Sequence, residues 1–254
     1  MMRKIVLLLA FFTLNTIISQ SSNELFEQAN EYYKNQEYSK AITLYEQIEE
    51  TGEVSSELFY NLGNSYYKIN KVGPSIYNYE KALLLNPLNE DAQNNLIFAK
   101  RLSLDRIEEL PKSVLQKFNE NYLSKLSYNQ WAVLAVILSF LTSCLFLLYY
   151  FSQIPSYKRF YFTSSILSVI FLIAVLSITL NQYKKASNTI QAIVYATEVS
   201  VKNEPIKNAD EAFVLHEGTK VFVLDEVDDW KKIRLVDGKI GWLKKDQINI
   251  LSVF

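Results

Sequence analysis

Cysteine and histidine are almost missing from this chain of 254 residues, which has one of each. A disulfide needs two cysteines, so none forms within the chain, and Cys/His zinc sites and Cys–His catalytic pairs lack their partners. Glycine and proline are also scarce, with six and five residues, which excludes low-complexity and collagen-like classes. Phosphate-cradling, dinucleotide-binding, zinc-protease and serine-hydrolase motifs do not occur. We therefore expect no catalytic residue, no metal site, no cofactor and no enzymatic activity.

The chain also lacks a large excess of charge of either sign, because its net charge is only -1. That balance excludes a strongly basic nucleic-acid-binding protein. Apolar residues make up 49% of the chain and charged residues 21%, which indicates polar domains combined with membrane-length apolar runs. Residues 131–151 and 160–180 are two such runs, each free of charge and long enough to cross the ~30 Å hydrocarbon layer as a helix. Aromatic residues cluster at their ends, and the loop between them predicts a tight transmembrane hairpin.

Residues 1–19 predict a secretory signal peptide, with Arg3 and Lys4 ahead of an apolar run. An uncleaved membrane anchor is the alternative. The positive-inside rule is indecisive, because Lys158 and Arg159 favour a cytoplasmic loop whereas Lys184 and Lys185 at the far end oppose it. The export signal decides the orientation. We expect a protein of the cytoplasmic membrane with both soluble regions on the periplasmic, outer side.

Residues 22–55 and 56–89 are in register at a period of 34, the strongest signal in the sequence. In the second unit Gly63 and Ala82 allow two helices to approach closely, and Pro87 ends the unit. A capping helix within residues 90–106 follows. This pattern resembles the tetratricopeptide repeat, so we expect residues 22–106 to form an all-α repeat solenoid.

The resemblance implies that the first helix of each repeat lines a concave, protein-binding groove. The positions that match this groove carry Asn, Tyr and Lys: Asn30, Tyr33, Lys34, Tyr60, Asn61, Asn64, Tyr67 and Lys68. Asn can pair with the backbone amides of a bound segment, and Tyr supplies stiff apolar area. The alternative is that these residues only follow the repeat consensus.

Residues 107–130 predict an amphipathic connector, whose apolar positions after Ser113 follow helical spacing. Two interpretations stay open for it. The helix rests on the membrane surface beside the first span, or it packs on the repeats.

Residues 190–254 change to a period of two with many β-branched residues. Candidate strands are residues 193–201, 212–216, 220–227, 230–236 and 239–243. Four ordered blocks, such as DDWKKI at 228–233 and DGKIGWL at 237–243, resemble the bacterial SH3-like domain, a small all-β barrel. Trp230 and Trp242 are candidates for an aromatic binding surface, with core or rim packing as the alternative. His216, the only histidine, is expected to be an ordinary polar residue.

The whole order of signal, two repeats, hairpin and SH3-like domain resembles the BatE-like members of the Bat group of aerotolerance-associated membrane proteins. The resemblance includes NLGNSYYKINKVGPSIYNYEKALLLNPLNEDAQNNLIFAKRL and the DRIEELP that follows it. It implies an envelope complex with von Willebrand A-type Bat membrane proteins, linked to oxidative or general stress tolerance. We therefore expect a membrane-anchored adaptor for other envelope proteins, with the lipid bilayer as its surroundings and no nucleic acid as partner. The alternative is a protein that anchors to peptidoglycan through the SH3-like domain.

Overall fold

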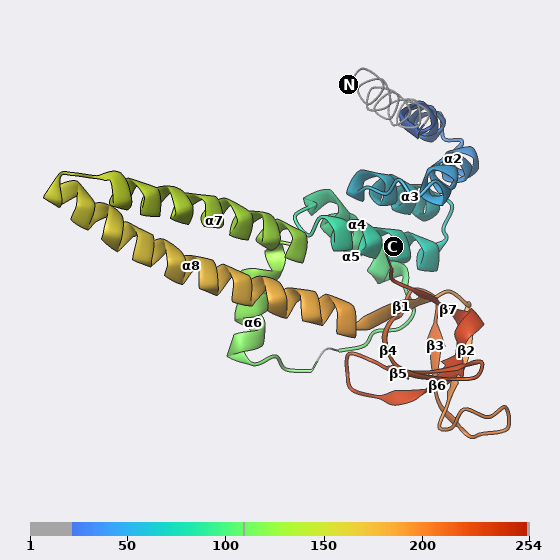
Figure 1. Ribbon diagram of the computed structural model, residues 1–254. Helices are drawn as coiled ribbons and strands as arrows, with labels where there is room; N and C mark the ends of the chain where they lie inside the picture. Colours follow the sequence, from blue (N-terminus) through green and yellow to red (C-terminus); the bar gives the residue numbers. More distant parts are fainter. Residues whose placement is uncertain (1–21, 109, 253–254) are drawn as a thin grey trace, which may run out of the picture. The chain divides into compact units, whose positions relative to one another are not determined.

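The computed structural model describes residues 22–108 and 110–252 (Figure 1). In chain order the helices are residues 22–34, α2 (Tyr38–Glu50), α3 (Ser56–Lys68), α4 (Val72–Leu85), α5 (Glu90–Leu102), α6 (Val114–Asn121), α7 (Tyr128–Phe151) and α8 (Pro155–Asn188). Seven strands follow. The chain forms two compact units, of which one holds the N-terminal helices and the strands, and the other mainly residues 111–190. The signal peptide predicted over residues 1–19 lies outside the described residues.

The N-terminal helices repeat their local structure after 34 residues. The turns before α2 and α4 place Gln36 and Asn70 in the left-handed region, with φ of 63° and 58°. Ser55 and Asn89 cap α3 and α5 in the same way, because each side-chain oxygen accepts a hydrogen bond from the backbone N–H three residues later. The turns and the caps therefore both recur at the period that the sequence predicts.

Close approach within the second helix pair depends on Gly63. A Cβ at this position would lie 2.8 Å from Cδ1 and Cε1 of the Tyr79 ring, which is only 1% exposed. The Ser75 hydroxyl also crosses the pair and donates to the Gly63 carbonyl at 2.9 Å. The seam between α3 and α4 is thus as tight as the Gly63 and Ala82 pattern predicts.

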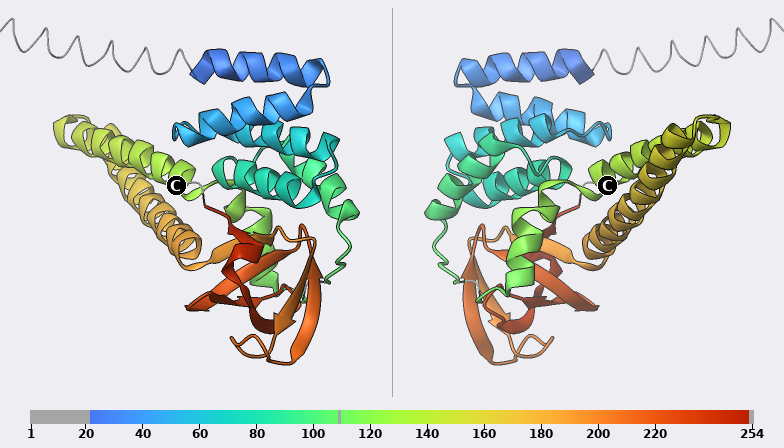
Figure 2. Two further views of the ribbon diagram at one scale, coloured as in Figure 1. Left: turned by 90° about the vertical axis from the view of Figure 1, so that its right-hand side faces the viewer. Right: turned by 90° about the vertical axis from the view of Figure 1, so that its left-hand side faces the viewer.

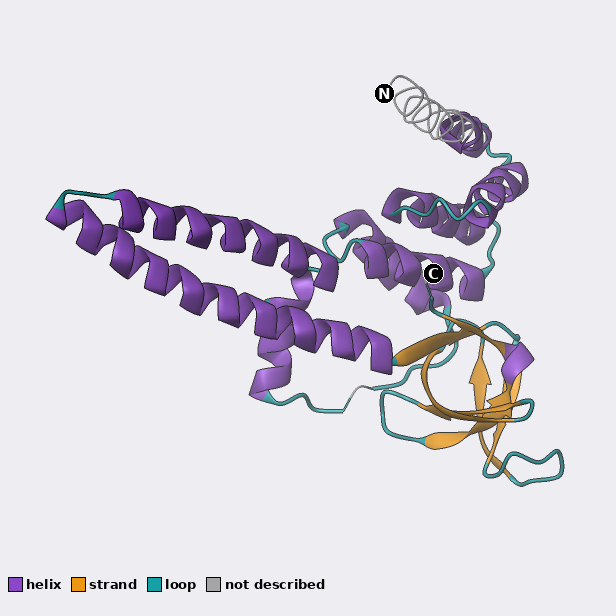
Figure 3. Ribbon diagram, viewed as in Figure 1, coloured by secondary structure: helices purple, strands orange, loops and turns teal. Residues whose placement is uncertain are grey.

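The strands form one antiparallel sheet (Figure 3). They are β1 (Ile190–Val194), β2 (Glu198–Lys202), β3 (Glu211–His216), β4 (Lys220–Val227), β5 (Trp230–Arg234), β6 (Ile240–Lys244) and β7 (Ile248–Ile250), in the spatial order β3-β2-β6-β5-β4-β1-β7. The prediction of one strand over residues 193–201 is wrong. The chain leaves β1 at Tyr195, whose N–H donates to the Gln247 carbonyl, and re-enters the sheet as β2. The seventh strand was not predicted, since three residues give no periodic signal.

The helices and the sheet share a hydrophobic core within the first unit. Val72 and Ile76 of α4 and Leu96 of α5 pack in one buried cluster with Ile193 of β1 and Leu251, which follows β7. Figure 2 shows the sheet beside the last helices of the stack. The N-terminal helices and the sheet therefore bury apolar surface against each other.

Residues 111–190 contain two helices that are long and apolar enough to cross a membrane. α7 has 24 residues and α8 has 34, so their lengths are about 36 Å and about 51 Å. Both begin before the predicted spans, at residues 128 and 155 rather than 131 and 160. Only residues 152–154 separate the two helices, whereas eight residues lie between the two apolar runs. Pro155 opens α8 at a position where proline is favourable, so Lys158 and Arg159 lie inside the helix.

Polar contacts are few between α7 and α8. The Thr142 hydroxyl of α7 and the Ser168 hydroxyl of α8 meet at 2.7 Å. The Trp131 indole N–H of α7 donates to the Leu123 carbonyl, which precedes α7, at 2.9 Å. The predicted connector helix is α6, which has no buried residue, and its Val114 and Leu115 side chains are 84% and 81% exposed. This apolar face is thus uncovered within its own unit.

Candidate protein-binding surfaces

Asn side chains on the first helices form a repeated hydrogen-bond pattern. Asn30 Oδ1 accepts from the Tyr45 hydroxyl at 2.6 Å and from Asn61 Nδ2 at 3.0 Å. One repeat later, Asn64 Oδ1 accepts from the Tyr79 hydroxyl at 2.6 Å and from Asn95 Nδ2 at 2.8 Å. Each pattern links a helix to its paired helix and to the first helix of the next unit.

This pattern divides the predicted asparagines into two kinds. The carbonyl oxygens of Asn30 and Asn64 accept hydrogen bonds from buried tyrosines, so both asparagines stabilise the fold. Asn61 donates one hydrogen bond to Asn30, and its own carbonyl oxygen has no hydrogen-bond partner among the described residues. The carbonyl oxygen of Asn95, on α5, likewise has no hydrogen-bond partner among the described residues. Asn95 is the equivalent of Asn61 at the period of 34, and the repeat pattern also places it among the groove positions.

Tyrosines surround these amides. The Tyr60 hydroxyl lies 3.4 Å from Asn95 Nδ2, and its ring lies 6.2 Å from the Tyr79 ring. Tyr33 packs edge-on against Tyr38 at 5.3 Å, and burial, with the neighbouring Tyr38 and Tyr60, raises its pKa. The structure thus brings Asn30, Tyr33, Tyr60, Asn61 and Asn64 together as one surface, which we call the first-helix face.

The other predicted residues lie at its margin. Tyr67 is partly buried against the core shared with the sheet, while Lys34 and Lys68 are exposed near the ends of their helices. The exposed ammonium groups add positive charge beside the amides of the first-helix face.

Trp230 and Trp242 lie on the same side of two neighbouring strands. β5 and β6 are antiparallel, and the register pairs Trp230 with Lys244 and Lys232 with Trp242. The alternate residues, including Ile233 and Leu243, are buried in the core of the β domain. Both tryptophans are half-buried, so they belong to the outer face of this sheet and not to its core.

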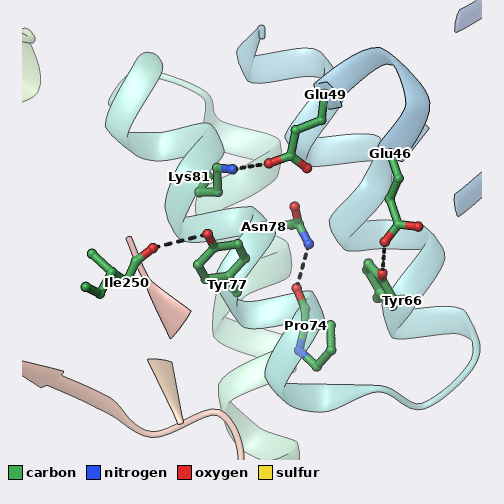
Figure 4. A network of polar contacts seen from close by, with 8 residues as sticks. All are labelled: Glu46, Glu49, Tyr66, Pro74, Tyr77, Asn78, Lys81 and Ile250. Atoms are coloured by element: carbon green, nitrogen blue, oxygen red, sulfur yellow. Dashed lines mark hydrogen bonds and ion pairs between the residues drawn. The ribbon is translucent and has the colours of Figure 1, made fainter. Parts of the chain in front are cut away.

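Polar side chains of α2, α3 and α4 form a network that was not predicted from the sequence (Figure 4). The Lys81 side chain, 5% exposed, pairs with Glu49 and lies 4.0 Å from the centroid of the Phe59 ring. The Tyr77 hydroxyl donates to the Ile250 carbonyl at 3.1 Å, and burial raises the pKa of Tyr77 to about 12. The buried Asn78 Oδ1 has no hydrogen-bond partner among the described residues. The sequence signal for this network is Lys81 in α4, because a lysine that is buried between helices is rarely left without a partner.

Charged contacts also join the helices to the sheet. Glu80 lies between Lys100 at 2.9 Å and Lys220 at 2.7 Å, and Lys220 belongs to β4. Burial alone would raise the pKa of the Glu80 carboxyl, but the two ammonium groups outweigh it and lower this pKa to about 2. These groups form a charged bridge between α4, α5 and the sheet.

His216 takes part in the same junction between the helices and the sheet. Asp105, which follows α5, accepts hydrogen bonds from the His216 backbone N–H and lies 2.7 Å from its Nδ1. The Thr219 hydroxyl donates to the same carboxylate. Burial acts to raise the pKa of Asp105, but these bonds outweigh it and lower the pKa.

Neither a metal cluster nor a selective cleft stands out in the part of the chain that the structure describes. It contains no group of three or more His, Cys, Asp or Glu side chains arranged to hold a metal ion. An apolar cleft of about 280 Å³ between α7 and α8 is lined by aromatic and aliphatic side chains such as Phe146 and Phe162. No family model matches this chain, and neither does any curated protein. The geometry of the candidate surfaces is therefore the basis for assigning them a function.

Proposed function

We propose that this protein is a membrane-anchored adaptor that assembles other envelope proteins. In this proposal the N-terminal helices are tetratricopeptide repeats, the C-terminal sheet is an SH3-like domain, and α7 and α8 form a transmembrane hairpin. The first-helix face carries the proposal, because it gathers tyrosine rings and amides with unused hydrogen-bonding capacity. Such surfaces suit peptide or helix recognition, since each unpaired polar group can satisfy a guest's backbone.

The cellular role rests on the resemblance to the Bat group. It gives an envelope complex with von Willebrand A-type Bat membrane proteins and a link to oxidative or general stress tolerance. The apolar face of α6 is uncovered within its own unit, as the membrane-surface interpretation of the connector requires. Anchoring to peptidoglycan through the SH3-like domain is the second candidate, which the half-buried tryptophans on the outer face of that domain favour.

Co-purification from mild detergent tests the adaptor proposal. We expect a variant with Asn61→Ala and Lys68→Ala to recover about tenfold less of its partner than the wild type, which corresponds to about 1.4 kcal/mol. The matched control is Gln47→Ala with Lys71→Ala, which removes the same two chemical groups from exposed positions away from the first-helix face.

Melting curves of both variants verify that the fold is intact. Equal partner recovery by the two variants would contradict recognition by the first-helix face. Retention of the wild type on purified sacculi, independent of these substitutions, would favour peptidoglycan anchoring instead.

A further inference from the structure

The outer face of the sheet continues beyond the two tryptophans. Lys202 of β2 pairs with Trp242, and Phe222 of β4 pairs with Arg234 of β5. Residues that face each other across a strand pair project from the same side of a sheet, and alternate residues of one strand do so too. One surface therefore gathers seven side chains, which we call the basic–aromatic face: Lys202, Phe222, Trp230, Lys232, Arg234, Trp242 and Lys244.

None of these seven side chains is buried, and four of them are cations. The Lys232 ammonium lies 5.7 Å from the centroid of the Trp242 ring, and the Arg234 guanidinium lies 5.2 Å from that of Phe222. Cation–π contacts of this kind hold the long side chains against the sheet while leaving their charges in water. Cations and rings therefore alternate across the surface.

Unlike most other lysines of the domain, these cations lack carboxylate partners. Lys220, Lys231, Lys239 and Lys245 each form an ion pair. Within residues 22–108 and 110–252, no ion pair involves the four cations of the basic–aromatic face. Two acids lie opposite these cations in register, Asp225 opposite Lys232 and Glu211 opposite Lys202. Their carboxylates accept hydrogen bonds from the Glu226 N–H and the Ser200 hydroxyl. Four cations therefore stand against two carboxylates, which leaves net positive charge for a ligand.

The geometry of the face fits an extended chain. Alternate residues on a strand are about 6.6–6.8 Å apart, and an extended peptide carries its alternate side chains at the same spacing. Carboxylates on every second residue of such a peptide can therefore meet successive cations. The tryptophan rings between them supply apolar contact area, which such a ligand needs because exposed ion pairs alone contribute little to affinity.

The charge of the whole domain limits the length of this ligand. Residues 190–254 hold 11 acids and 9 Lys or Arg residues, so the net charge is -2 despite the basic face. A long polyanion would extend from the face onto acidic surface and meet like charge. A short acidic segment contacts only the cations and the rings.

We propose that the basic–aromatic face binds a short acidic segment of a partner protein in extended conformation. This gives the proposed adaptor a second surface, separate from the first-helix face. The two proposals can fail independently, because their experiments alter different domains.

Fluorescence anisotropy with the full-length protein in detergent micelles tests the proposal. The probe is a short labelled peptide in which Glu alternates with Thr, and the reference probe carries Gln in place of each Glu. We expect the Glu peptide to bind about tenfold more tightly than the Gln peptide, with an affinity that falls as salt is added. Lys232→Gln with Lys244→Gln should weaken binding of the Glu peptide about tenfold.

Lys239→Gln with Lys245→Gln is the matched control. It removes the same charge from the same domain, but these ammonium groups already pair with Asp237 and Asp229. We expect its affinity to stay at the wild-type value, and near-ultraviolet circular dichroism should show an unchanged domain in both variants. Equal binding of the two peptides, equal loss in the control, or binding of a long polyanion but not of the short peptide would each overturn the proposal.

Discussion

Asn61 and Asn64 lie one turn apart on α3, yet their side chains form different kinds of hydrogen bond. Asn64 accepts the hydroxyl of Tyr79, a ring that is 1% exposed, whereas Asn61 donates to Asn30 in a partly buried position. A buried donor that loses its only partner costs about 1–3 kcal/mol, and a partly solvated bond contributes about 0.5–1.5 kcal/mol. The two amides are therefore unequal sites for a binding experiment.

We predict that Asn64→Ala lowers the free energy of unfolding by about 1–3 kcal/mol, because the Tyr79 hydroxyl stays buried without an acceptor. Asn61→Ala should cost about 1 kcal/mol or less. Chemical denaturation of the two variants, followed by circular dichroism, measures the difference. If Asn61→Ala were the more destabilising change, the hydrogen-bond pattern of the first-helix face would be wrong.

At the scale of elements, the bridge of Glu80, Lys100 and Lys220 fixes α4 and α5 against the sheet. The folded-state pKa of Glu80 is about 2, below its ordinary value of 4.5. Because the pKa is lowered on folding, the stabilisation is fully present above pH 4.5 and is lost as the pH falls towards 2. The shift corresponds to about 3 kcal/mol as an upper value.

We predict that Glu80→Gln destabilises the protein at neutral pH and flattens the loss of stability between pH 4.5 and 2. Urea denaturation of the full chain at a series of pH values measures both effects. The control is Glu57→Gln, which neutralises an exposed carboxylate on α3 and should leave the acid profile unchanged. Parallel acid profiles for the wild type and Glu80→Gln would contradict the bridge.

Local patterns predicted the elements better than they predicted their contacts. The period of 34 located the helix pairs, and the two long uncharged runs located α7 and α8. Each of these signals depends only on residues that are close together in the sequence. Residues that meet only after folding gave no such signal. Asp105 and His216 are 111 positions apart, and Ile193 enters the core of helices that end before α7 begins.

The same limit applies to the candidate binding surfaces. The sequence singled out Trp230 and Trp242, but the alternation with Lys232 and Lys244 depends on the register of two strands. It also left open whether Asn64 binds a partner or supports the fold. That question needed the distance between Asn64 and Tyr79, which no spacing rule gives.

For the whole molecule, the shared core constrains how the chain crosses a membrane. Residues before α7 and residues after α8 bury side chains against one another in one cluster. Both therefore have to be on one side of any membrane that α7 and α8 cross. The shared core requires this whether or not residues 1–19 are a signal peptide, because the signal peptide determines only which side of the membrane that is.

Cysteine labelling tests whether both regions lie on one side of the membrane and which side that is. The experiment is practicable because Cys144 is the only thiol in the sequence. On a Cys144→Ser background, single cysteines replace the exposed residues Asn94, Asp210 and Ser156, which lie in α5, in the β domain and at the start of α8. We predict that a membrane-impermeant reagent labels positions 94 and 210 in right-side-out vesicles, and position 156 only in inverted ones. Labelling of positions 94 and 210 from opposite sides would contradict the shared core. Labelling of both only in inverted vesicles would leave that core intact and reverse the proposed orientation, so the adaptor would face the cytoplasm.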